Sequence, residues 1–157
     1  MKVARTVWTY IKSDRIVRDE SIATEDWEAT TGIVTKDLLE KSVTFFYDAP
    51  KTWPPTYSAT FSFSTTASRT ETIDLDWDYS WFHSYFLAYT RVVLYVEREG
   101  LPLTEVELVN IAGGDYRQAT GSITINLEEG DLYGISIFGG HYDSAETISG
   151  TIKLTQN

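Results

Sequence analysis

The chain has 157 residues, a length that suits a single domain with a sizeable core. Its 13 Lys and Arg residues against 23 Asp and Glu residues give a net charge of −10 without a compact basic cluster, which argues against a nucleic-acid binder. The absence of cysteine excludes thiol catalysis, disulfides and thiolate metal sites. Aromatic residues make up 14% of the chain and favour strands and recognition surfaces.

Alternating apolar and polar residues predict strands along most of the chain. The expected strands cover residues 3–12, 41–49, 58–65, 70–79, 91–99, 104–110, 121–127, 132–138 and 147–155. Residues 36–41 could instead form one helical turn. The expected breaks fall at residues 66–68, 80–85, 100–102, 113–115, 129–131 and 139–144. Short strands with such spacing are typical of an all-β fold, an antiparallel two-sheet β-sandwich.

Four stretches of the last two-thirds carry a resemblance: "TETIDLDWDYS", "VVLYVEREGLPLTEV", "GSITINLEEGDLYGISIFGG" and "SGTIKL". The third stretch contains a turn that carries the resemblance further, formed by Gly130, Asp131, Tyr133 and Gly134. The region from about 58 to 155 resembles a β-sandwich module of bacterial surface and secreted proteins. That module is similar in layout to CUB and jelly-roll domains. The resemblance implies an adhesive or structural role without catalysis. We expect one domain over 1–157, with 1–57 as an N-terminal extension that contributes strands or an anchor.

The stretch "DLDWDYSWFHSYF" opens with three aspartates at alternate positions, Asp74, Asp76 and Asp78. Alternate residues of a strand point to one face about 7 Å apart, so these carboxylates do not converge on one ion. Position 79 is Tyr, where an EF-hand loop needs glycine. We therefore expect a solvated acidic face with a cross-strand partner such as Arg91, and no metal or cofactor; calcium at the loops stays open as an alternative.

Successive connections of an antiparallel sandwich alternate between its two ends, so the segments 80–85, 113–116 and 139–144 should share one rim. Loops on a rigid sandwich often carry binding residues. The predicted ligand- or partner-binding residues of this rim are Trp81, His83, Tyr85, Asp115, Tyr116, His141, Tyr142 and Asp143. The alternative is that Trp81 and Phe82 close the end of the core and that the histidines are ordinary loop residues.

No catalytic motif is present, so we expect no enzyme. The interpretation we favour is a structural or adhesive component of an extracellular assembly, most of all a phage virion protein (decoration, tail or fibre) or a bacterial surface module. The alternative is a carbohydrate-binding module that uses the aromatic rim. Expected partners are other protein subunits, including copies of the chain in a homo-oligomer, or a glycan, with no nucleic acid. Without a recognisable signal peptide or membrane span, an extracellular or virion location implies release by another route such as lysis.

Overall fold

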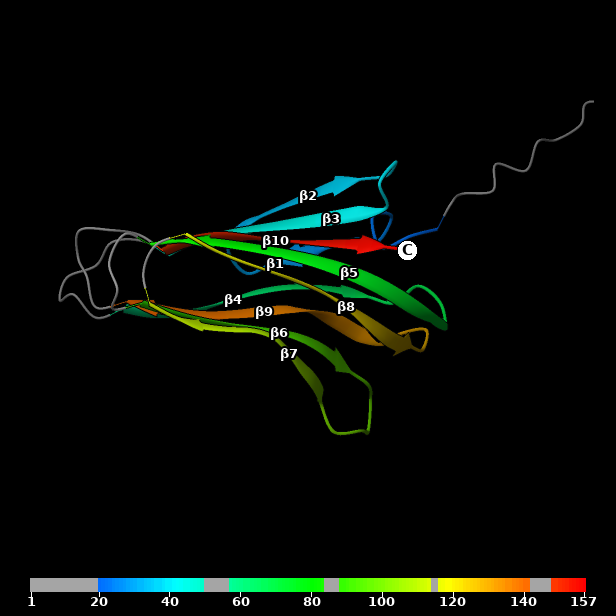
Figure 1. The fold of residues 1–157 in the computed structure, drawn as a ribbon. Helices are drawn as coiled ribbons and strands as arrows, with labels where there is room; N and C mark the ends of the chain where they lie inside the picture. Colours follow the sequence, from blue (N-terminus) through cyan, green and yellow to red (C-terminus); the bar gives the residue numbers. More distant parts are fainter. Residues whose placement is uncertain (1–19, 50–56, 84–87, 114–115, 142–147) are drawn as a thin grey trace, which may run out of the picture.

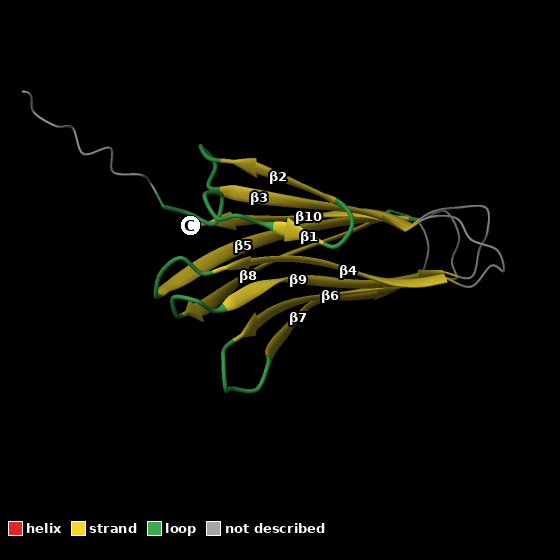
Figure 2. Ribbon diagram, turned by 180° about the vertical axis from the view of Figure 1, so that it is seen from behind, coloured by secondary structure: helices red, strands yellow, loops and turns green. Residues whose placement is uncertain are grey.

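The computed structural model describes residues 20–49, 57–83, 88–113, 116–141 and 148–157, and in these every regular element is a strand. Ten strands form two layers, as Figures 1 and 2 show. In chain order they are β1 (Glu28–Ala29), β2 (Ile33–Asp37), β3 (Ser42–Ala49), β4 (Tyr57–Thr66), β5 (Glu71–Phe82), β6 (Ala88–Glu97), β7 (Thr104–Ala112), β8 (Arg117–Leu127), β9 (Leu132–His141) and β10 (Ile148–Gln156).

Two five-stranded antiparallel sheets make the sandwich. Sheet A has the order β1-β4-β9-β6-β7 and sheet B the order β2-β3-β10-β5-β8. The predicted β-sandwich is therefore confirmed. Strands β1, β2 and β3 all come from the part of the chain before residue 50 and complete both sheets. The predicted strand over 3–12 lies outside the described residues, and no helical turn forms at 36–41, where β2 ends in a turn.

The core follows the alternation seen in the sequence. Eight of the residues that the pattern places inward are buried: Phe61, Phe63, Ile73, Leu75, Leu94, Ile125, Ile135 and Ile137. Trp77 and Ile123 share that phase but are only partly buried; Ile123 lies on the edge strand β8, and Trp77 lies on β5 beside it. The ring of Trp77 lies instead against Gly121 of β8, its cross-strand neighbour.

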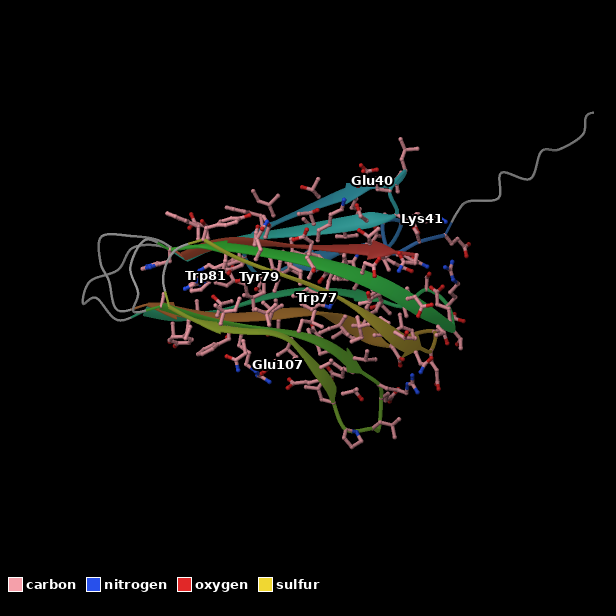
Figure 3. The ribbon with its side chains drawn as sticks, in the orientation of Figure 1. Glu40, Lys41, Trp77, Tyr79, Trp81 and Glu107 are labelled. Atoms are coloured by element: carbon pink, nitrogen blue, oxygen red, sulfur yellow. The ribbon has the colours of Figure 1, made fainter. Side chains whose placement is uncertain are left out.

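Several strands run further than the sequence predicts, and two of them extend three residues into predicted breaks. β5 continues through residues 80–82, and β9 continues through residues 139–141, both of which we expected to be breaks. The reason at β5 is that the inward phase of Tyr79 carries on to Trp81, which is buried between the sheets together with Tyr79 (Figure 3). A buried aromatic at the next inward position favours continuation of the strand.

The N-terminal segment before β1 closes one end of the core. Ile22 and Ala23 are buried, and the backbone N–H of Ile22 donates to the Gln156 side chain of β10 at 2.8 Å. The indole of Trp27 donates to the carbonyl of Ile22 at 2.8 Å and packs edge-on against Phe45. This end is therefore sealed by residues outside the region that carries the resemblance.

The glycine-aspartate motif, Gly130 and Asp131, forms the turn between β8 and β9. Gly130 adopts a φ of 94°, a conformation that favours glycine. Asp131 is buried and accepts hydrogen bonds from Arg98 Nη2 at 2.7 Å and from the Glu128 backbone N–H at 2.8 Å. The hydrogen bond from Arg98 lowers the pKa of Asp131. The motif thus ties the end of β6 to this turn and serves the fold.

The three aspartates of β5 face solvent, as predicted. Asp74 accepts a hydrogen bond from the Thr124 hydroxyl at 2.5 Å, and Asp76 accepts one from Ser122 at 2.6 Å, both on β8. The prediction that Arg91 is the cross-strand partner of these aspartates is wrong, because Arg91 lies on β6 of sheet A and donates a hydrogen bond to Glu107 at 2.6 Å. Among the described residues no cluster of acidic or histidine side chains could hold a metal ion.

Replacing Asp74, Asp76 and Asp78 together with asparagine should change the free energy of unfolding by no more than about 0.5 kcal/mol per site, the usual range for surface positions. Asparagine keeps an oxygen that accepts the hydroxyl hydrogen bonds of β8. Thermal unfolding with and without calcium or a chelator checks this. A chelator that lowers the melting temperature of the native chain but not of the triple variant would contradict it.

Candidate functional site

The connections predicted to share a rim start from strand ends that lie together. Register pairs Ala49 with Ile148, Phe82 with Ser149 and Trp81 with Arg117 in sheet B. In sheet A, His141 pairs with both Tyr57 and Ala88. The ends of β3, β5, β7 and β9 therefore gather at one end of the sandwich, whereas residues 84–87, 114–115 and 142–147 lie outside the described residues.

The predicted site residues divide into three groups. Trp81 and His83 are buried, with Trp81 only 1% exposed, so the alternative in which Trp81 closes the core describes its position. Tyr116 is 57% exposed just before β8. His141 ends β9, but its side chain lies outside the described part of the chain. Four further residues also lie outside it: Tyr85, Asp115, Tyr142 and Asp143.

Beside this end, the outer face of sheet B carries a shallow groove of about 180 Å³. We call it the aromatic groove. Its lining includes three exposed aromatics from three elements, which are Phe46, Phe82 and Tyr116. Phe46 is 36% and Phe82 50% exposed, so both rings offer apolar surface to solvent. Large rings left in water beside a depression are unusual for a sheet surface that serves only solubility.

Small hydroxyl side chains fill the space between the aromatics. Thr151 of β10 lies opposite Phe46 on one side and Ser80 on the other, so the three form one row across the sheet. The hydroxyls of Ser80 and Thr151 are 2.7 Å apart. Ser149, two residues along β10, pairs with Phe82 in the next row. The groove thus has apolar walls and a floor of hydrogen-bonding groups.

Strand geometry gives the scale of the groove. Phe46 and Phe82 stand on β3 and β5, with β10 between them, and their rows are offset by two residues. Strands lie about 4.8 Å apart and two residues span about 7 Å, so the two Cα atoms are roughly 12 Å apart. That span suits an extended ligand with several polar groups better than a single small ion or molecule.

One carboxylate borders the groove. Asp48 is exposed on β3 and pairs with Ser149 in the row of Phe82. Within the described residues the groove lining contains no acidic side chain, histidine or lysine. Glycoside hydrolysis needs two carboxyl groups at a fixed separation across the scissile bond.

Sequence reasoning missed Phe46 and gave Phe82 only a core-closing role. A signal for both was available in the strand phase. Val43, Phe45 and Tyr47 are buried, so Phe46 must point outward from β3. In the same way, Trp81 is inward and Phe82 is outward on β5. An aromatic in the polar phase of an amphipathic strand was therefore the feature to look for.

A second aromatic surface lies on the outer face of sheet A. Tyr89 of β6 and Phe138 of β9 have ring centroids 5.5 Å apart, and Phe138 is 41% exposed. The ring of Tyr89 lies over Gly140, its cross-strand neighbour. This pair packs on itself and over the backbone of β9.

No protein-family model matches this chain, and no curated protein matches it. Among solved structures, it is similar to TmCBM61 in complex with β-1,4-galactotriose, with 16% identity, a TM-score of 0.44 and coverage of 83% of this chain and 88% of that one. It is also similar to the CBM22-2 xylan-binding domain of Paenibacillus barcinonensis Xyn10C, with 10% identity, a TM-score of 0.33 and coverage of 90% of this chain and 93% of that one. A third similar structure is the enzymatically active domain of bacteriophage CBA120 tailspike protein 4, with 13% identity, a TM-score of 0.42 and coverage of 86% of this chain and 20% of that one. At these values the likeness extends only to the β-sandwich.

Proposed function

We propose that this chain is a non-catalytic adhesive β-sandwich module that binds a short oligosaccharide in the aromatic groove, as part of an extracellular or virion assembly. The observation that carries the proposal is the pair of exposed rings, Phe46 and Phe82, on either side of the hydroxyl row. Each sugar ring has an apolar face that can pack on an aromatic ring and a rim of hydroxyls that need hydrogen-bond partners. The groove offers both kinds of contact.

The polar contacts have a defined source. Ser80, Ser149 and Thr151 donate and accept hydrogen bonds, and Asp48 at the border accepts them. These groups sit on paired strands of one sheet, so little side-chain entropy is lost when they bind. An uncharged oligosaccharide fits this set best, because the chain is strongly acidic and the groove lining offers no cation among its described residues.

The test compares single alanine variants of groove aromatics with a matched control. Replacing Phe46 or Phe82 should weaken binding about tenfold or more, which corresponds to about 1.4 kcal/mol, because exposed aromatics dominate recognition surfaces. Phe138→Ala removes a similarly exposed ring from the other sheet and should leave binding unchanged. A glycan array identifies the ligand, and isothermal titration calorimetry gives the affinities.

Two results would contradict the proposal. One is that the native chain binds no glycan on a broad array at high protein concentration. The other is that Phe46→Ala and Phe82→Ala bind as tightly as the native chain while Phe138→Ala does not. Circular dichroism of each variant establishes that its fold is kept, which is expected because all three rings lie on outer faces.

A further inference from the structure

The side of the sandwich between β7 and β8 is open. Among the described strands, β7 pairs only with β6 and β8 only with β5, so both are edge strands. The hairpin of β6 and β7 turns away from the other layer near its tip (Figures 1 and 2). A cleft of about 330 Å³ lies there, and we call it the edge cleft. Its apolar lining is Leu94, Val96, Leu101, Pro102, Val106 and Ile125.

The hairpin beside this cleft carries apolar side chains that are in contact with water. Leu101, Leu103 and Val106 are 58%, 51% and 40% exposed, and they follow one another within six residues of the hairpin. An edge strand of nine residues with exposed apolar side chains is a template for pairing with another strand. β7 has no lysine on its edge; its charged side chains are Glu105 and Glu107, and its register with β6 shifts at Leu108, between the pairs Val92 with Val109 and Val93 with Glu107.

The hairpin is also acidic. Residues 97–107 contain four glutamates and one arginine. That arginine, Arg98, already pairs with Asp131 and Glu128. Arg91, the neighbouring cation, pairs with Glu107 at 2.6 Å and lies 3.9 Å from Glu105. Glu97 and Glu99 at the hairpin therefore add negative charge that no ion pair of the described residues offsets.

The charge that complements this hairpin lies in residues 1–19. That segment has five basic and two acidic residues, a net charge of +3, whereas residues 20–157 have eight basic and twenty-one acidic residues, a net charge of −13. Within it, residues 3–11, "VARTVWTYI", match β7 in length and have the composition of a strand. Trp8 and Tyr10 share one strand phase and are the residue types that most often anchor interfaces.

We infer that residues 3–11 of one copy add to the free edge of β7 in a second copy and place Trp8 in the edge cleft. Lys2, Arg5 and Lys12 then approach the glutamates of the hairpin. The chain enters its own sandwich at Glu20 to Ala23, beside the C-terminal end of β10 (Figure 1). The edge cleft lies between β8 and the hairpin of β6 and β7, two strands beyond β10 in sheet B, and the inference places residues 3–11 of a neighbouring copy there.

Cysteine cross-linking of the full chain tests the inference, since the native sequence has no cysteine. A chain with Trp8→Cys is mixed with a chain with Val106→Cys under mild oxidation, and mass spectrometry measures the mixed disulfide. The control partner carries Ile33→Cys, an exposed apolar residue on β2, the opposite edge of the sandwich. The mixed disulfide with Val106→Cys should exceed the one with Ile33→Cys at least tenfold and should decrease in high salt.

Equal cross-linking to the two partners would overturn the inference. So would a disulfide that forms only within a single chain carrying both Trp8→Cys and Val106→Cys, because the arm would then occupy its own cleft. Neither substitution touches the aromatic groove. Glycan binding by the Val106→Cys chain therefore separates a failure of this inference from a failure of the proposed function.

Discussion

Replacing Gly134 with alanine should destabilise the protein by about 3 kcal/mol or more, at or above the upper end of the usual cost of overpacking. A Cβ atom at this position would lie 2.0 Å from the carbonyl oxygen of Phe63 and 2.9 Å from the Cα of Ser64. Both atoms belong to the backbone of β4, the strand paired with β9. Relief requires β4 and β9 to move apart in the middle of sheet A. Urea unfolding followed by circular dichroism measures the loss.

The matched control is Gly139→Ala on the same strand. There an added Cβ would meet its nearest atoms, Thr90 Oγ1 and the Tyr89 carbonyl oxygen, at 3.7 Å, which is ordinary contact distance. We expect a change within about 1 kcal/mol, the span of strand propensities. Equal stabilities of the two variants would show that the strands at Gly134 are not packed as described.

The second large effect is a loss of stability in alkali. Tyr47 and Tyr79 are buried, and their hydroxyl oxygens are 2.6 Å apart. Burial raises the pKa of Tyr47 to about 12 and raises the pKa of Tyr79 and of Tyr133 as well. The native state therefore keeps these protons above pH 10, where tyrosines of the unfolded chain lose theirs. Stability is full below about pH 10 and falls as the pH rises through the native pKa.

The shift of Tyr47 alone corresponds to a loss of about 2 kcal/mol by pH 12, because each unit of pKa is worth about 1.4 kcal/mol. Tyr79 and Tyr133 add losses of similar size, so the protein should unfold between about pH 11 and pH 12, given a typical total stability of about 5–15 kcal/mol. Urea unfolding at a series of pH values from 8 to 12 measures this. Tyr47→Phe should give a shallower dependence, and an unchanged slope would contradict the assignment.

The fold could be predicted from sequence because alternation carries direct information about strand faces. Ile73, Leu75 and Tyr79 lie inward on β5 as their phase requires. The same pattern could not show that Trp77 is only partly buried, because this depends on the pairing of β5 with the edge strand β8, in which Gly121 is opposite Trp77. Edge and centre are properties of the tertiary pairing, which a local pattern does not contain.

The candidate site was predicted less completely. The count of alternating connections placed the correct strand ends together, and Tyr116 belongs to the resulting groove. Composition assigned Trp81 to the rim and gave Phe82 only a core-closing role, although adjacent strand residues face opposite ways and Phe82 is the exposed one. Phe46 was missed because it comes from β3, far from the rim segments in sequence, and only the pairing of β3 with β10 brings it to the groove.

The most direct test of the account is a nuclear magnetic resonance titration of the isotope-labelled chain with the oligosaccharide that a glycan array selects. We predict that the backbone amide signals that shift with the ligand belong to residues that line the aromatic groove, namely Phe46, Ser80, Phe82, Ser149 and Thr151. Signals around Phe138, on the outer face of sheet A, should stay in place. Shifts centred on Phe138 and Tyr89, or none in the aromatic groove at saturation, would contradict the account.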